Sequence, residues 1–206
     1  MRTRGRLLLA GLASATLLST AVSTAAANRL SVSETEFEVK WEALVFAEAF
    51  TNITCPVTML GRFHSRTIVK VTRILVGMIN HAVVGRCEFD GRATVLQETL
   101  PWHITYDGFI GTLPAITHIR LHMVGASFRV GDGIFCLART DFAEPAVGTA
   151  VTRTATGQIS TLNANPEAEI EVDERVGLCA LAEDVSLSGN GRVTTLSGSL
   201  IFIRLI

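Results

Sequence analysis

His118 and His122 are the residues whose spacing comes closest to a metal-binding motif in this chain. Two histidines four residues apart lie on one face of a helix in the H-E-x-x-H motif of zinc proteases. Here Ile119 takes the place of the glutamate, and Ile119, Leu121 and Met123 alternate with polar residues. This alternation indicates a strand, on which the two imidazoles would lie about 13 Å apart. We therefore expect the polar face of an exposed strand and predict no metal ligand.

His64, His103 and Asp107 are the remaining residues from which a hydrolase could be assembled with a serine. A Ser-His-Asp site needs a hydroxyl within hydrogen-bond reach of a histidine and an acid that orients this histidine. Ser65 follows His64 directly, but adjacent residues of a strand point to opposite faces. The chain also contains no G-x-S-x-G nucleophile elbow. We predict no catalytic residue, with an extracytoplasmic hydrolase as an alternative.

Carboxylates gather in the run Glu167, Glu169, Glu171 and Asp173, with Glu174 beside it. Calcium prefers such oxygens, but calcium loops fold back on themselves and place Asp, Asn and Gly at spaced positions. This run alternates as a strand does and contains no glycine. We favour a solvated strand face that protects a sheet edge, with calcium as the alternative, and predict no cofactor.

Trp102, His103, Tyr106 and Phe109 form the densest aromatic cluster of the chain. On a regular strand, Trp102 and Tyr106 share one face, whereas His103 and Phe109 point the other way. Packing of the first face into the core is the simplest interpretation. The alternative is a ligand surface formed by these four residues, on which a sugar or an apolar molecule would stack.

The N-terminus has the order of a secretory signal peptide. Three arginines in the first six positions precede an apolar run over residues 7–18, and small residues end at Ala27. The apolar run is shorter than the roughly 20 residues that cross a bilayer as a helix. We therefore predict a removable signal over residues 1–27 and a secreted or extracytoplasmic location for the mature chain from Asn28.

Four cysteines lie in the part of the chain that follows this signal: Cys55, Cys87, Cys136 and Cys179. An even number of cysteines in an oxidising compartment predicts two disulfides, for which three pairings are possible. We favour Cys55 with Cys87 and Cys136 with Cys179, because each bridge then closes a short loop and stabilises by roughly 3–4 kcal/mol. Zinc is disfavoured, since structural zinc sites usually contain closely spaced cysteine pairs.

Composition limits the class of protein. Without the signal, about 180 residues remain, which suits one domain with its own core, over residues 28–206. Loss of the three N-terminal arginines takes the net charge from -1 to -4. This mildly acidic balance argues against a nucleic-acid partner, and the mature chain shows no apolar run that predicts a transmembrane helix.

Short runs rich in Val, Ile, Thr and Phe predict a mainly β fold, an antiparallel β-sandwich or β-barrel. The predicted strands are 37–41, 43–47, 57–63, 93–97, 102–109, 116–130, 134–139, 149–162, 169–172, 178–181, 185–187, 193–195 and 199–206. The sequence Gly189-Asn190-Gly191 predicts a hairpin turn between two of them.

Residues 67–84 depart from this strand pattern. Apolar side chains, among them Ile68, Val71 and Leu75, recur there at three- and four-residue spacings. Such spacing predicts one amphipathic helix, which we expect to cover an open end or face of the sheet.

Three sequence segments, 61–68, 98–106 and 111–114, resemble a group of uncharacterised exported proteins of high-GC Gram-positive bacteria. The resemblance extends over nearly the whole mature chain. It implies secretion and adds no activity, ligand or partner.

These observations predict an exported, non-enzymatic β-domain that binds a small apolar or sugar ligand or a partner in the cell envelope. The first alternative is the hydrolase described above. The second is a small outer-membrane β-barrel, which the alternating strands and the apolar end 200–206 suggest. The cysteines and the scarcity of aromatic residues argue against that second alternative.

Overall fold

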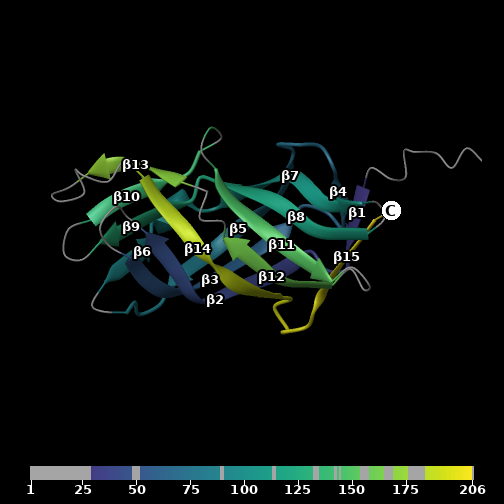
Figure 1. Cartoon of the computed structure of the whole chain (residues 1–206), viewed down its shortest axis with the longest axis horizontal. Helices are drawn as coiled ribbons and strands as arrows, with labels where there is room; N and C mark the ends of the chain where they lie inside the picture. Colours follow the sequence, from purple (N-terminus) through teal and green to yellow (C-terminus); the bar gives the residue numbers. More distant parts are fainter. Residues whose placement is uncertain are drawn as a thin grey trace, which may run out of the picture.

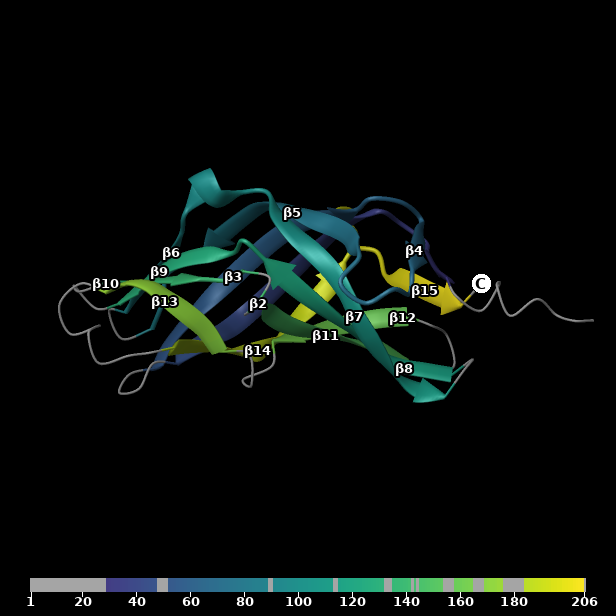
Figure 2. The same cartoon turned by 90° about the horizontal axis from the view of Figure 1, so that it is seen from above.

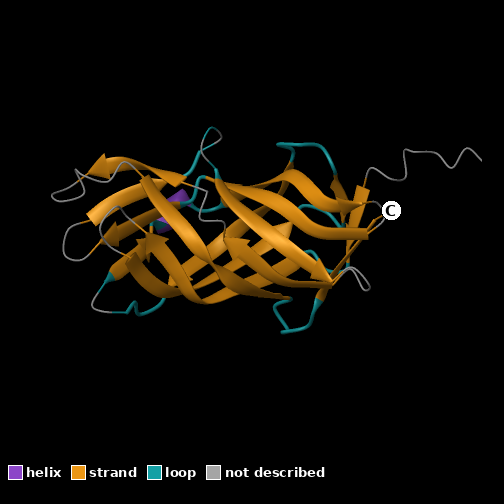
Figure 3. Ribbon diagram, viewed as in Figure 1, coloured by secondary structure: helices purple, strands orange, loops and turns teal. Residues whose placement is uncertain are grey.

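A computed structural model describes residues 29–47, 52–88, 91–112, 115–131, 135–141, 143, 145–153, 158–164, 169–175 and 184–205. Within these ranges the chain is built from strands, with one short 3-10 turn, η2 (Gln97–Thr99), and no α-helix (Figure 3). The strands are β1 (Arg29–Val32), β2 (Glu36–Ala47), β3 (Asn52–Phe63), β4 (Thr67–Val69), β5 (Leu75–Val84), β6 (Arg92–Val95), β7 (Trp102–Thr112), β8 (Ala115–Val124), β9 (Ser127–Gly131), β10 (Phe135–Arg139), β11 (Ala146–Arg153), β12 (Gln158–Ala164), β13 (Glu169–Arg175), β14 (Asp184–Thr194) and β15 (Ile201–Leu205). The predicted mainly β fold is confirmed.

Eight antiparallel strands close into a barrel in the order β2-β3-β5-β7-β8-β11-β12-β14, because β14 pairs both with β12 and with β2. Closure leaves none of these eight strands as a free edge, which removes the exposed ladder that open sheets must protect. Of the two architectures predicted from the sequence, the barrel is therefore the correct one.

Two smaller groups of strands extend the barrel at opposite ends (Figures 1 and 2). At one end, β13 pairs with β14 and continues into β10, β9 and β6. At the other end, β15 pairs with β12 and continues into β1 and β4. Both groups of strands thus continue from barrel strands and lie at the two ends of the molecule.

Alternation of buried and exposed residues explains the barrel strands. In β3 every second residue from Ile53 to Phe63 is buried, and the residues between them are partly or fully exposed. In β2 the buried positions change from odd to even numbers between Trp41 and Leu44, where the register shifts and Glu42 is exposed. A β-bulge at this point keeps both halves of β2 facing the core.

The end of the barrel beneath β9 is filled by aromatic side chains. Phe128 of β9 lies with its ring 5.4 Å from that of Phe46 and 5.2 Å from that of Trp102, and all three are almost fully buried. Tilted and edge-on ring pairs at this distance are favourable packing arrangements. The strands at this end therefore share one hydrophobic core with the barrel.

The helix predicted for residues 67–84 is wrong. The segment forms β4, a turn and β5, and β5 carries one extra residue in its pairing with β7 and another in its pairing with β3. Each bulge delays the alternation by one position, so that the buried residues Val76, Ile79 and Ala82 recur at every third position. Two bulges in a strand therefore produce a spacing that resembles the period of a helix.

The hairpin turn predicted at residues 189–191 is also wrong, because all three residues lie inside the continuous strand β14. Gly189 and Gly191 allow β14 and β2 to approach each other closely. A Cβ atom on Gly189 would lie 2.8 Å from the carbonyl oxygen of Ala43, and one on Gly191 would lie 2.6 Å from the indole ring of Trp41. Gly in a strand often marks such close contact with a neighbouring chain segment.

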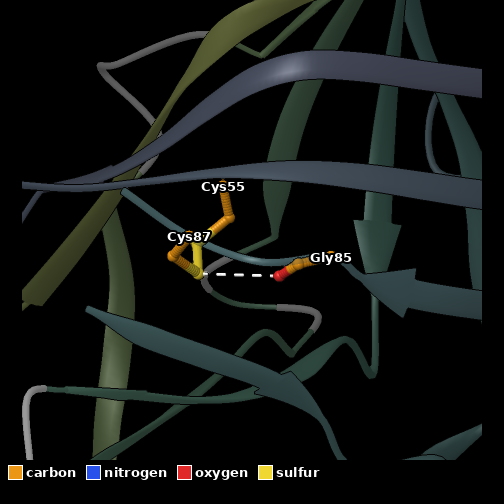
Figure 4. The surroundings of a disulfide bond; sticks show 3 residues. All are labelled: Cys55, Gly85 and Cys87. Atoms are coloured by element: carbon orange, nitrogen blue, oxygen red, sulfur yellow. Dashed lines mark hydrogen bonds between the residues drawn. A yellow bond between two sulfur atoms is a disulfide. The ribbon is translucent and has the colours of Figure 1, made fainter. Parts of the chain in front are cut away.

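The predicted disulfide Cys55–Cys87 is confirmed (Figure 4). It joins β3 to the segment that follows β5, where the Cys87 sulfur lies 3.8 Å from the carbonyl oxygen of Gly85. Cys136 is fully buried and is not a free thiol. Its predicted partner, Cys179, lies outside the described residues, so that the second bridge stays a prediction. The signal segment 1–27 also lies outside them.

Candidate functional site

A cavity of about 100 Å³ lies inside the barrel. All eight barrel strands contribute side chains to its wall, and Ile68 of β4 and Ile203 of β15 also line it. Protein cores are packed to crystal-like density, with few voids larger than a water molecule. A space of this size inside a barrel is therefore larger than the voids that ordinary protein cores contain.

Small residues on two neighbouring strands line part of this space. Ala146 and Gly148 of β11 and Ala164 of β12 line the cavity, as do the large side chains of Phe37 and Met59. An eight-stranded barrel is just wide enough for inward-facing side chains to fill it or for one small ligand. The space beside Gly148 is partly taken up by Leu162, since a Cβ at Gly148 would lie 3.2 Å from a methyl carbon of that leucine.

The wall is apolar except for three residues: Trp41, Tyr106 and His122. Trp41 is only 5% exposed, and its indole Nε1 has no hydrogen-bond partner. Among the described residues, no other buried side-chain nitrogen or oxygen lacks a partner. Burial, together with the neighbouring Asp107 carboxylate, raises the pKa of the Tyr106 hydroxyl against an opposing effect of Arg120. Tyr106 therefore stays protonated and can donate a hydrogen bond.

The backbone of β14 fixes the position of Trp41. Gly191 pairs with Trp41 across the β2–β14 ladder, and the indole occupies the space that a side chain at Gly191 would fill. The bulge in β2 beside Trp41 adjusts the strand so that both this ring and Leu44 face inward. The indole N–H is thus held in place by packing.

A polar cluster lies at the bulge of β7, next to the cavity wall. The carboxylate of Asp107 forms an ion pair with the Arg120 guanidinium at 3.0 Å and lies 3.7 Å from Nε2 of His122. Burial lowers the pKa of His122, and Arg120 and Arg73 add to this effect, whereas Asp107 opposes it. At neutral pH the imidazole is therefore uncharged, and it lines both the barrel cavity and a smaller hollow beside Arg73.

The four residues of the predicted ligand surface do not form one surface. Trp102 is fully buried in the core, where its Nε1 donates a hydrogen bond to the Thr99 hydroxyl at 2.8 Å. His103 is exposed, and the Phe109 ring lies 5.4 Å from the ammonium nitrogen of a neighbouring lysine. Tyr106 alone lines the cavity. The proposed ligand role of these four residues stays a prediction.

The residues considered for a hydrolase are also placed apart. His64 lies in the exposed turn after β3, and His103 is exposed on β7. Asp107 instead interacts with Arg120 and His122. The structure thus shows an acid–histidine contact that the sequence interpretation did not consider, because the β7 bulge brings it together.

The candidate metal ligands do not converge within the described residues, where no group of three His, Cys, Asp or Glu side chains could hold a metal ion. His118 and His122 lie on strand β8, as predicted, and the His118 ring interacts with the hydroxyl of Thr117. Residues 169–175 form β13, but their side chains and Glu167 are not among the described features. The solvated face and the calcium alternative for this run both stay predictions.

The alternation of Phe37, Val39 and Trp41 was the signal in the sequence that pointed to the cavity wall, since it marks an inward strand face. In the part of the chain that the structure describes, no helix is long and apolar enough to cross a membrane. No protein-family model, no curated protein and no solved structure matches the chain.

Proposed function

We propose that the protein is an exported, non-enzymatic binding protein that holds one small apolar molecule inside its barrel. The observation that carries this proposal is the apolar cavity of about 100 Å³ within the closed barrel. Sites for drug-sized ligands measure about 300–1,000 Å³. An apolar protein cavity of about 150 Å³ stays dry and binds benzene. The size therefore favours a ligand with a single small ring or a short alkyl chain.

The composition of the wall favours an apolar ligand over a sugar. A sugar buries several hydroxyl groups, each of which is costly to remove from water without a hydrogen-bond partner. The described wall offers polar groups only on Trp41, Tyr106 and His122, and hydrocarbon elsewhere. Of the two ligand classes predicted from the sequence, the apolar one suits this interior.

Two observations support the exported location in this proposal. The Cys55–Cys87 disulfide is of the kind that forms and persists in oxidising compartments. The N-terminal sequence has the order of a secretory signal, with arginines, an apolar run and small residues.

The direction of the side chains favours this function over an outer-membrane barrel. Membrane barrels of that kind carry apolar side chains outward and a polar interior. Here the interior is apolar, and β2 places Lys40 and Glu42 on the exposed face. Among the described residues, no group of a serine, a histidine and an acid supports the hydrolase alternative.

Benzene is a suitable first probe of the cavity. At a concentration ten times its Kd, benzene bound to the folded state is expected to raise the Tm of the purified protein by about 3–6 °C. Ala146→Leu fills the cavity from its wall and should abolish this increase. Ala43→Leu, the same substitution on the exposed face of β2, should retain it. An unchanged Tm in wild-type protein at saturating benzene would contradict the proposed function.

A further inference from the structure

The segment 70–75, which leads from β4 into β5, presents apolar side chains to solvent. Residues 71–75 are five consecutive exposed positions, and three of them are large and apolar: Val71 is 54% exposed, Ile74 38% and Leu75 44%. Single exposed apolar residues are common on protein surfaces, whereas a cluster of them marks a contact site for a protein or a membrane. This segment is therefore a candidate contact surface.

Hydrogen bonds to β7 hold the segment in one position. The N–H of Arg73 donates to the carbonyl oxygen of Tyr106 at 2.7 Å, and the N–H of Tyr106 donates to the carbonyl oxygen of Ile74 at 3.0 Å. The Thr72 hydroxyl donates to the carbonyl oxygen of Asp107 at 3.1 Å. These backbone groups have partners inside the protein, as they need wherever a segment enters an apolar phase.

Arg73 turns the chain within this segment. Its φ of 65° lies in the left-handed region, which a glycine would adopt without strain. A residue with a side chain is held in this conformation at a cost in free energy, and such residues cluster at functional sites. The turn places a long cationic side chain between the exposed residues Val71 and Ile74.

Positive charge is concentrated in this part of the sequence. Residues 49–87 contain five Lys or Arg and no Asp or Glu, whereas the rest of the chain after the predicted signal contains ten and nineteen. Lys70 and Arg73 belong to the segment itself. The carboxylate of Asp107, which accepts the Thr72 hydrogen bond through its backbone, is paired with the Arg120 guanidinium at 3.0 Å. The segment is thus apolar and basic in a chain that is otherwise acidic.

This combination of side chains fits an anionic lipid surface. Segments that bind membranes peripherally bury apolar side chains at the headgroup boundary and place Lys or Arg against anionic lipids. A second copy of the chain would bring the positive charges of two such segments together, which is unfavourable. The charge of the segment therefore favours the membrane.

We propose that the segment 70–75 binds the exported protein to a membrane surface that contains anionic phospholipids. Val71, Ile74 and Leu75 insert at the headgroup boundary, and Lys70 and Arg73 lie against the lipid phosphates. This inference goes beyond the proposed function, since none of these five residues lines the barrel cavity.

Sedimentation of the purified mature protein with vesicles tests the inference. One set of vesicles contains equal parts of phosphatidylglycerol and phosphatidylcholine, and the other contains phosphatidylcholine alone. Wild-type protein should bind the anionic vesicles about 25-fold more tightly, because each of the two basic residues contributes about a fivefold gain near an anionic surface. Raising the salt concentration from about 0.1 M to about 1 M should remove most of this preference through screening.

Two matched pairs of variants assign the binding to the segment. Arg73→Gln should weaken binding to the anionic vesicles about fivefold, whereas Arg129→Gln, at an exposed position of β9, should leave it unchanged. Val71→Ser should weaken binding to both kinds of vesicle about tenfold, because less apolar surface leaves the water. Val83→Ser, which alters a residue 44% exposed near the other end of β5, should not.

The outcomes separate this inference from the proposed function. Equal affinity of wild-type protein for the two vesicle compositions, or no binding to either, would overturn the inference, and this comparison needs no variant. Equal losses in Val71→Ser and Val83→Ser would overturn it as well. A dimer in sedimentation velocity that Val71→Ser dissociates would assign the segment to a second copy instead. The effect of benzene on the Tm should persist in Val71→Ser, because this residue lies outside the cavity wall.

Discussion

At the scale of single residues, Gly191 shows how the absence of one side chain makes room for another. Its missing Cβ leaves the space that the Trp41 indole occupies, and a Cβ there would lie 2.6 Å from the ring. The sequence interpretation assigned this glycine to a turn, since Gly-Asn-Gly is a common turn sequence. Only the folded barrel shows that Trp41 on the neighbouring strand is the residue that requires a glycine at this position.

Gly191→Ala is expected to destabilise the protein by about 1–3 kcal/mol, because the new methyl group forces the buried indole or the strand to move. Urea unfolding measures the change. Gly108→Ala is the matched control, since its Cβ would meet only the tip of the Arg120 side chain at 3.4 Å, and it should stay within about 0.5 kcal/mol of wild type. Equal stability of the two variants would show that Gly191 is not needed for close packing.

His122 should make stability depend on pH. Burial lowers its pKa in the folded state, so that between this lowered value and the unfolded value of 6.5 the unfolded chain binds more protons. The neutral imidazole therefore contributes fully to the free energy of unfolding above pH 6.5. This contribution is lost as the pH falls through the folded-state pKa. Urea unfolding at a series of pH values should show wild type losing stability relative to His122→Asn on acidification.

His64→Asn is the control for that series, because His64 is exposed in the turn after β3. Its stability should run parallel to that of wild type across the same pH range. If the free energies of unfolding of wild type and His122→Asn differed by the same amount at every pH, His122 would not be the source of the pH dependence.

At the scale of elements, β5 shows why local spacing misled the prediction. A helix was predicted over residues 67–84 from apolar residues three and four apart, yet Val71 and Leu75 are about half exposed. The two bulges that place Val76, Ile79 and Ala82 on one face depend on the partners β3 and β7. A bulge is a property of a pair of strands, and one segment of sequence does not contain it.

The disulfide between β3 and the segment that follows β5 belongs to this scale, since it joins two parts of the chain that are 32 residues apart in sequence. Cys55→Ala combined with Cys87→Ala is expected to cost about 2–5 kcal/mol in urea unfolding, because the unfolded chain regains the freedom of this loop.

Intact mass before and after reduction tests the second predicted bridge, between Cys136 and Cys179. Reduction adds two hydrogens per bridge, and a gain of only two would exclude that second pairing.

At the scale of the whole molecule, the structure selects the barrel from two predicted architectures. A sandwich and a barrel bury the same alternating residues, so that the alternation seen in β3, where a strand was predicted over residues 57–63, does not distinguish them. The pairing of β14 with both β12 and β2 closes the ring. This contact joins segments far apart in sequence, and it converts the small residues Ala146, Gly148 and Ala164 into the wall of a cavity.

The sequence alone determined the mainly β class of the chain and the inward face of Phe37, Val39 and Trp41. These depend on residue type and on periodicity along one segment, and are therefore local properties. The tertiary structure alone decided the closure of the barrel, the bulges of β5 and the unpaired donor on Trp41. Each of these arises where several strands meet, and whether a buried N–H has an acceptor depends on every neighbour that packs around it.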